Sequence, residues 1–244
     1  MKKCYFLSML MLAASMLPAL VACNSDDDDQ DPSGMKLTGY GYTDGKLYYK
    51  ITSETAMEVT VSKAEDNLVS ADIPTVVSIR GVDYRCTSIG EFAFADCTAL
   101  TSVNIPSSIS AIDQYAFAGC SGLTSIDIPT SVRTLGAYAF YGCSHLSAIN
   151  IPSGVSSIGK RAFSDCVTLN IVTIPASVNN IGQYAFFGCV DLSAVHCKIK
   201  EPLANESLFS DDTYSTAILF VPRGALSAYQ NALGWDQFLS IVEE

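Results

Sequence analysis

The chain has 244 residues, of which 49% are apolar and 16% charged, so it can bury a sizeable core and does not have the composition of a disordered protein. Its formal net charge of −11 argues against nucleic acid as a partner, because phosphate binding requires clustered Lys and Arg. Part of that charge is local, in the aspartates between positions 26 and 31. Acidity of this kind keeps a protein soluble and names no ligand.

Residues 1–22 are predicted to be a secretion signal. A short positive start precedes an apolar run from Tyr5 to Ala22, and Cys23 follows directly. Small residues before a cleavage point are those that a signal peptidase accepts. An uncleaved membrane helix is the alternative, since the 18 residues of the run are near the minimum needed to span a bilayer.

The sequence Leu20-Val21-Ala22-Cys23 resembles the lipobox of bacterial lipoproteins. This resemblance implies cleavage after Ala22 and a diacylglyceryl group on the thiol of Cys23, and two or three acyl chains give a stable anchor. Residues 23–34 would then be an acidic flexible tether, because adjacent aspartates repel one another. The tether is also similar to the acidic surface-export tags of Gram-negative anaerobes, and a plain linker is the alternative. We expect an exported protein, lipid-anchored to the outer membrane and exposed at the cell surface.

A 23-residue repeat dominates the rest of the chain. Five cysteines keep this interval, as do five phenylalanines that each follow Ala: Phe94, Phe117, Phe140, Phe163 and Phe186. Each unit also contains Leu-x-x-Val/Ile-x-Ile, as in Leu123, Ile126 and Ile128, and this alternation predicts a short strand with one buried face. The Gly-x-x-Ala-Phe stretch predicts a tight helical or 3₁₀ turn on the outer side of each unit.

The unit Ile-Gly-x-x-Ala-Phe-x-x-Cys-x-x-Leu-x-x-Val-x-Ile-Pro resembles the BspA-like leucine-rich repeats of bacterial surface lipoproteins. We therefore predict an α/β solenoid of 23-residue leucine-rich repeats with short parallel strands, five of them in residues 89–199. Stacked coils leave open ends that need covers. Residues 35–88 are predicted to be an N-terminal β-cap with a hairpin, and residues 200–244 a degenerate sixth repeat with a strand-helix C-terminal cap.

The repeat cysteines are expected to form a buried ladder of free thiols, composed of Cys97, Cys120, Cys143, Cys166 and Cys189. Disulfides are the alternative for an exported protein, and coils about 4.8 Å apart make them conceivable. Five equivalent cysteines at one interior position favour packing instead. Cys86 and Cys197 lie outside the register, and the sequence predicts no role for them. No Cys pair has metal-ligand spacing, so neither a metal nor a cofactor is predicted.

The sequence contains no motif that indicates an enzyme. Its two histidines, His145 and His196, occupy repeat positions that other units fill with unrelated residues. There is no Gly-x-Ser-x-Gly, no phosphate-binding loop and no dinucleotide fingerprint. We therefore predict a binding protein rather than a catalyst.

Two surfaces are candidate binding sites. The first is the concave face that a solenoid builds from outward strand side chains, here Ser102, Asn104, Ser125, Asp127, Asn150, Thr173 and His196. The second is an aromatic stripe on the outer turns, composed of Phe92, Tyr115, Tyr138, Arg161 and Tyr184. This stripe is either a contact surface or semi-buried packing of rings on neighbouring turns, and packing is the preferred interpretation.

The family resemblance implies a surface adhesin for host matrix proteins or other cells. One alternative is a structural or accessory envelope lipoprotein that binds another envelope protein. Another is a sugar-binding lipoprotein, which an exposed tyrosine stripe would support. We expect a monomer that contacts the membrane only through its lipid anchor, has a protein or glycan ligand, and does not bind nucleic acid. Fold alone does not imply function, so the sequence does not identify the ligand.

Overall fold

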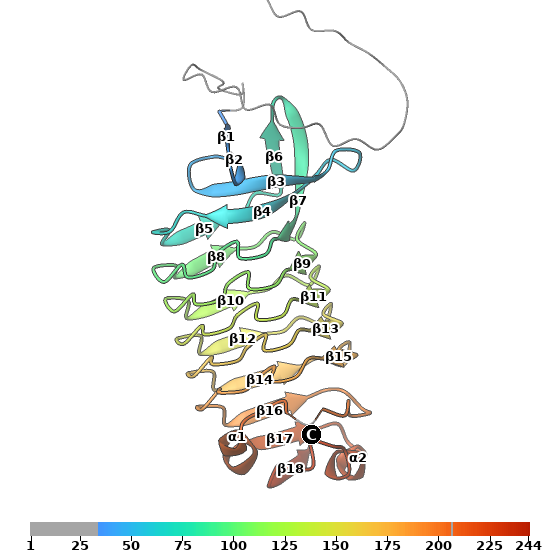
Figure 1. The fold of residues 1–244 in the computed structure, drawn as a ribbon. Coiled ribbons are helices and arrows are strands. Elements are labelled where there is room, and N and C mark those ends of the chain that lie inside the picture. The colour runs from blue at the N-terminus through green and yellow to red at the C-terminus, as the bar shows by residue number, and fades with distance from the viewer. Residues whose placement is uncertain (1–33, 206) are drawn as a thin grey trace, which may run out of the picture.

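The computed structural model describes residues 34–205 and 207–244. The predicted signal peptide, Cys23 and almost all of the tether lie outside the described residues. The described chain is an elongated solenoid whose coils stack along one axis (Figure 1). Residue 34 lies at the end that carries the N-terminal sheet, and the C-terminus lies at the other end, near the two helices.

Each repeat contributes one strand to each of two parallel ladders. In the first ladder each residue from β10 to β14 pairs with the residue 23 positions later, as Ser125 pairs with Ala148. Its repeat strands are β8 (Ser102–Asn104), β10 (Ser125–Asp127), β12 (Ala148–Asn150), β14 (Ile171–Ile174) and β16 (Ala194–Cys197), with β8 paired to β5 (Ser70–Asp72) and lying beside β10. The second ladder contains β9 (Ala111–Ile112), β11 (Thr134–Leu135), β13 (Ser157–Ile158) and β15 (Asn180–Ile181). Through the regular repeats both ladders have this offset of 23 residues, so each coil lies directly on the next. The predicted repeat solenoid is confirmed.

An antiparallel sheet covers the N-terminal end. Its strands are β1 (Lys36–Thr38), β2 (Gly41–Thr43), β3 (Leu47–Ser53) and β4 (Glu58–Ala64). Strand β4 runs parallel to β7 (Val82–Ile89), and β7 in turn pairs with β9, so the sheet continues into the second ladder. Strand β6 (Val76–Ile79) forms a hairpin with β7, whose turn residues Arg80 and Gly81 have φ of 53° and 76°. Two left-handed residues match the twist of a two-residue hairpin.

The outer segment of each repeat is a series of β-turns, so the helical or 3₁₀ turn expected from the sequence is wrong. In the first repeat the N–H of Ala93 donates to the carbonyl of Gly90 at 3.2 Å, and Phe92 between them has φ of 58°. A left-handed residue at this place in a turn interrupts a right-handed helix. The next amide, that of Phe94, donates to Ala116 of the following coil at 2.7 Å. Amides that a helix would use internally therefore hold neighbouring coils together.

Identical side chains form columns inside the solenoid. Six phenylalanines stack with ring centroids 4.9, 5.3, 5.2, 5.4 and 5.5 Å apart along Phe94, Phe117, Phe140, Phe163, Phe186 and Phe209. All six rings are buried, and each such burial stabilises the fold by about 1.5–3 kcal/mol. Phe209 continues the column by one coil beyond the five regular units.

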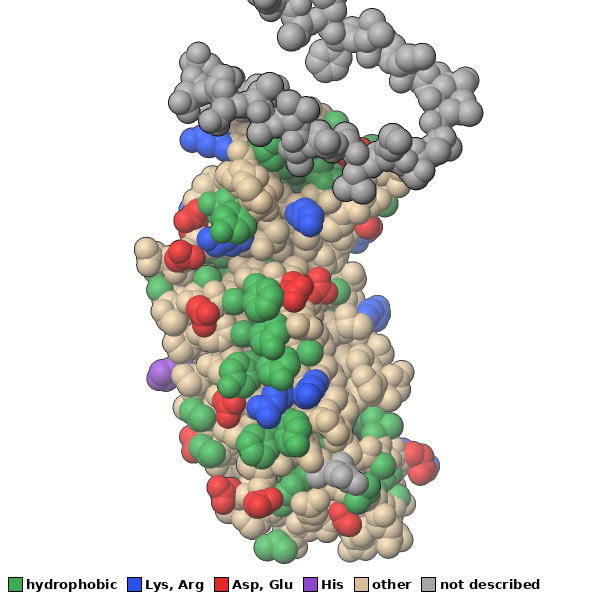
Figure 2. All heavy atoms as spheres, in the orientation of Figure 1, with side chains coloured by type: hydrophobic (Ala, Val, Ile, Leu, Met, Phe, Trp, Pro, Cys, Tyr) green, Lys and Arg blue, Asp and Glu red, His purple; other side chains and the backbone are tan. Residues whose placement is uncertain are grey.

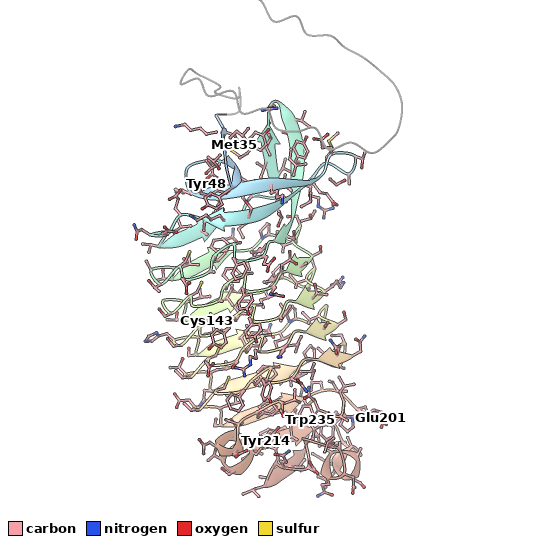
Figure 3. All side chains as sticks on the ribbon, in the orientation of Figure 1. Met35, Tyr48, Cys143, Glu201, Tyr214 and Trp235 are labelled. Atoms are coloured by element: carbon pink, nitrogen blue, oxygen red, sulfur yellow. The ribbon has the colours of Figure 1, made fainter. Side chains whose placement is uncertain are left out.

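The C-terminal segment closes the last coil. Strands β17 (Ile218–Val221) and β18 (Ser240–Glu243) extend the first ladder, and helices α1 (Asp211–Thr216) and α2 (Leu226–Gln230) lie beside them. Trp235 is fully buried here, and its Nε1 donates to the carbonyl of Leu203 at 2.7 Å. Figure 3 labels Trp235 and Tyr214 at this end of the molecule. None of the helices in the described residues is long and apolar enough to cross a membrane.

Candidate binding surfaces

The outward side chains of the first ladder form one exposed face. Five of the seven residues predicted for the concave face are exposed, and Thr173 and His196 are half-buried. Between them, inward residues such as Ile126 and Ile149 are buried, as the two-residue period of a strand requires. The exposed members are small Ser, Asn and Asp side chains that can exchange hydrogen bonds with a ligand.

A groove runs along this face from the N-terminal sheet. At its deeper end a hollow of about 600 Å³ lies between the β2–β3 turn, with Asp44 and Lys46, and the first strands, with Asp72, Asn104 and Asp127. A shallower hollow of about 350 Å³ continues over β10, β12 and β14. Asp127 lines both hollows, so they adjoin, and we call the two together the strand groove. Sequence analysis missed the contribution of Asp44 and Lys46, because a cap turn carries no repeat signature.

The deep end of the strand groove is acidic. Its lining has the carboxylates of Asp44, Asp72 and Asp127 and the ammonium group of Lys46. Asn104 Nδ2 donates to Asp72 Oδ1 at 2.6 Å, and Asp44 Oδ1 accepts from the backbone N–H of Lys46 at 2.8 Å. These hydrogen bonds fix two of the three carboxylates. Three carboxylates against one ammonium group leave this end of the groove negative, and a concave negative surface attracts cationic groups.

The aromatic stripe is a stacked column. Its members are half-buried, except Phe92, which is exposed. Tyr115 lies between Phe92 and Tyr138, with ring centroids at 4.8 Å and 4.6 Å and interplanar angles of 6° and 13°. The guanidinium of Arg161 lies 4.9 Å from the ring centroid of Tyr184. The faces of the stacked rings are largely occupied by one another. A sugar would need a free aromatic face for its C–H groups, so this geometry disfavours a sugar platform here.

Two further aromatic residues, Tyr141 and Phe187, widen the column. Their rings meet Tyr138 and Tyr184 edge-on, each with ring centroids 5.7 Å apart. Both occupy one repeat position, which Ala95, Ala118 and Ser164 fill in the other units. An aromatic residue occurs at this position in only two of the five units, so a search for residues repeated in every unit does not find it.

A family profile described as "BspA type Leucine rich repeat region" matches this chain in six copies over residues 77–212, more than half of its length. The chain belongs to the BspA-type leucine-rich repeat family. Among solved structures, the T. pallidum leucine-rich repeat protein is similar with a TM-score of 0.58 and 24% identity, over 74% of this chain and 86% of that one. At this identity the likeness shows the fold.

Two other solved structures are similar to this chain at lower scores. A leucine-rich repeat protein from Bacteroides ovatus has a TM-score of 0.40 and 19% identity, over 84% of this chain and 77% of that one. A leucine rich cell surface protein from Faecalibacterium prausnitzii has a TM-score of 0.48 and 21% identity, over 84% and 73%. No curated protein matches the chain.

The BspA-type repeats place their five cysteines in a buried column. Figure 3 labels Cys143, whose Sγ donates to the carbonyl of Phe117 in the preceding coil at 3.1 Å. Cys120, Cys166 and Cys189 make the same bond to the phenylalanine 26 residues earlier, at 3.0, 3.2 and 3.2 Å. The seven cysteines in the described ranges are free and buried. Burial raises the pKa of the Cys143 thiol to about 12, which keeps it protonated and unreactive.

The two cysteines outside the repeat register pack against the caps. Cys86 lies in β7, opposite Val59 of β4, and is fully buried, which raises its thiol pKa to about 12. Cys197 ends β16, where Tyr229 Oη lies 3.0 Å from its Sγ and donates to the carbonyl of Ile199 at 2.7 Å. Each therefore fills a junction between repeat and cap.

His196 belongs to the C-terminal cap rather than to an open face. Its ring lies flat on Phe220, with centroids 4.5 Å apart, and its Nδ1 is 3.0 Å from Glu244 Oε2. Lys198 also pairs with Glu244, and that hydrogen bond lowers the pKa of the Glu244 carboxyl. Across the two ranges that the structure describes, no group of His, Cys, Asp and Glu is arranged to hold a metal ion.

Proposed function

We propose that this protein is a lipid-anchored cell-surface adhesin that binds an extended segment of a host matrix protein, or of a protein on another cell, in the strand groove. The observation that carries this proposal is the groove itself, which crosses several coils and is lined by small polar side chains. Successive coils are about 4.8 Å apart, so an extended polypeptide meets a new set of donors and acceptors at each coil. Membership of a binding-repeat family agrees with this role.

The ligand segment should contain Lys or Arg at the deep end of the groove. Asp72 and Asp127 are exposed there, and Asp44 completes the acidic lining. Exposed charges are screened by salt, with a Debye length of about 8 Å at physiological ionic strength. Binding should therefore weaken as salt is raised.

A paired substitution tests the groove. Ser125→Arg places a long side chain in the floor of the strand groove, and Thr134→Arg places the same side chain on the exposed face of the second ladder. With unlipidated Cys23→Ala protein and immobilised matrix proteins, Ser125→Arg should reduce affinity at least about tenfold, while Thr134→Arg should not. Equal effects of both variants, or no effect of either, would mean that the ligand binds elsewhere.

The anchor and the orientation rest on the lipobox resemblance and on the acidic run that follows it. External protease on intact cells should remove the wild-type protein, and Cys23→Ala should release it from the membrane fraction. Protection until the outer membrane is broken would reject the adhesin role and favour the accessory envelope lipoprotein. Membrane retention of Cys23→Ala would reject the lipid anchor.

A further inference from the structure

The aromatic column of Phe92, Tyr115, Tyr138, Arg161 and Tyr184 is built on strained backbone. These residues have φ of 58°, 56°, 59°, 53° and 61°. The left-handed conformation costs a non-glycine residue about 1–2 kcal/mol. The second left-handed position of the same turns contains only Asp or Gly: Asp96, Gly119, Gly142, Asp165 and Gly188. Backbone preference therefore accounts for the second position and leaves the bulky side chains of the column unexplained.

Stacking offsets part of this strain, at about 0.5–1.5 kcal/mol for each ring pair. Stacking does not bury the column, since Phe92 is 52% exposed and the adjoining Phe187 is 38% exposed. Figure 2 shows hydrophobic side chains gathered in a column along the repeats, with acidic groups beside its upper end, basic groups farther along, and further acidic groups on its other side. Clustered aromatic side chains with an Arg are enriched at the centres of protein interfaces. Strain at an exposed aromatic surface suggests a contact role.

Charges are ordered along the column. The residues that directly precede its members are, in coil order, Glu91, Gln114, Ala137, Lys160 and Gln183. Glu91 and Lys160 are both exposed. Within residues 34–205 and 207–244 the ion pairs are Lys63–Asp66, His196–Glu244 and Lys198–Glu244, so neither Glu91 nor Lys160 is in one. Opposite charges thus lie three coils apart on the same edge of the column.

We propose that the aromatic column is a self-complementary interface between two copies of this chain, with their solenoids antiparallel. The two-fold axis would lie across the column, between the coils of Tyr115 and Tyr138. Every contact in such an interface occurs twice, because the two copies exchange roles across the axis. Glu91 of each copy then faces Lys160 of the other. Phe92 faces Arg161, a cation–π pair.

The same axis also matches side-chain sizes. In the row beside the column, Ala118 of one copy faces Tyr141 of the other, so a large ring meets a small side chain on both sides of the axis. A parallel pair, whose two-fold axis would run along the column, turns Glu91 and Lys160 toward the opposite edge of the partner's column and forms no Glu91–Lys160 pair. The Glu91–Lys160 pairs and the order of side-chain sizes therefore favour the antiparallel arrangement.

The dimer should be weak and reversible. Five coils at about 4.8 Å extend the column over roughly 20 Å, which is short of the ~800 Å² per partner of a standard interface. This inference departs from the monomer expected from the sequence. It does not depend on the strand groove, which lies on the first ladder, whereas the column lies on the outer turns.

Sedimentation velocity of the unlipidated Cys23→Ala protein over a concentration series tests the interface. We expect a monomer–dimer equilibrium whose dissociation constant rises about tenfold in Lys160→Glu and in Glu91→Lys, because each places like charges opposite one another twice. The double variant Glu91→Lys/Lys160→Glu should return to near wild-type affinity. Lys200→Glu, an exposed charge reversal away from the column, is the control.

Four results would overturn the proposal. They are a monomer up to the solubility limit, association that neither single reversal weakens, a double variant that stays weak, and an equal loss of association in Lys200→Glu. Far-ultraviolet circular dichroism of every variant confirms that it is folded. Because charge reversals of exposed residues usually change stability by less than about 0.5 kcal/mol, the variants should all fold.

Discussion

Tyr138 shows how a single residue combines strain and packing. Its φ is 59°, and its ring stacks on Tyr115 while meeting the edge of Tyr141. Replacing it by Ala removes the ring contacts and keeps a Cβ in a left-handed conformation. Replacing it by Gly removes the same contacts and relieves the strain.

We therefore predict that Tyr138→Ala is less stable than Tyr138→Gly by about 1 kcal/mol in urea unfolding. Tyr141 is the matched control, since its backbone is not among those with positive φ. There the order should reverse, with Tyr141→Gly the less stable variant, because glycine loses more freedom on folding. The same order at both sites would contradict the strain argument.

The buried cysteines make stability depend on pH. Burial raises the thiol pKa from 9.0 to about 12 in Cys86, Cys143 and Cys189, and the main cause at all three sites is desolvation of the thiolate. Between these two values the unfolded chain loses protons that the folded chain keeps. Rising pH therefore favours the unfolded state in this range.

We predict that the thiols make no pH-dependent contribution to the free energy of unfolding below about pH 9, and that this free energy falls as the pH rises from about 9 to about 12.

At pH 8 a thiol reagent should not react with the native Cys23→Ala protein from which the signal has been removed. In denaturant, without reductant, it should titrate seven thiols. Five or fewer would mean that disulfides form.

At the scale of the repeat element, close approach of the coils limits the side chains at one position. A Cβ built on Gly159 would lie 2.4 Å from the backbone N of Ala137, and one on Gly182 would lie 2.3 Å from the backbone N of Lys160. Both distances are shorter than Cβ contacts found in proteins, and the atoms met are backbone. A methyl group at either position could therefore be accommodated only if the backbone of the neighbouring coil moved.

Gly159→Ala should destabilise the protein by about 1–3 kcal/mol in urea unfolding, because it forces two coils apart. Asp113→Ala is the control, since the second coil already has a side chain at this repeat position. Its stability should change by less than about 1 kcal/mol. A similar loss in both variants would show that spacing between coils is not the cause.

At the scale of the whole molecule, one continuous core joins the two caps. Buried residues from Met35 to Phe238 belong to a single cluster, so no repeat has a core of its own. Each coil buries its edges only against its neighbours, which makes the terminal covers necessary for solubility. Trp235, Tyr214 and Phe238 provide that cover around Phe209 at the C-terminal end.

A chain that ends at residue 200 should lose its soluble monomer, because it exposes the Phe186 ring and the edge of β16. Size-exclusion chromatography and the soluble fraction on expression measure this loss. Deletion of residues 24–33 is the control, since every described contact stays in place. Trp235→Ala keeps the cap and should cost about 3–5 kcal/mol. A soluble monomer after truncation would show that the repeats close their own end.

The repeat, the solenoid and the family could be predicted from the sequence alone, because side chains that recur every 23 residues fall into columns once coils stack. The buried positions of Phe117 and Cys120 follow from that periodicity alone. The outer turns were not predictable in the same way. Gly-x-x-Ala-Phe fits both a helical turn and a β-turn, and the choice depends on amides such as that of Phe94 bonding to the next coil.

Features that join unrelated parts of the chain could not be predicted in this way and depend on the folded structure. Asp44 from the cap turn and Asp127 from the second regular repeat line one groove, and His196 pairs with Glu244 although 48 residues separate them. The stacking of Tyr115 on Tyr138 likewise depends on a left-handed backbone that spacing does not encode. Periodicity specifies which residues share a column, because equal intervals become equal positions in a stack. Contacts outside that period depend on where the caps and turns bring their side chains.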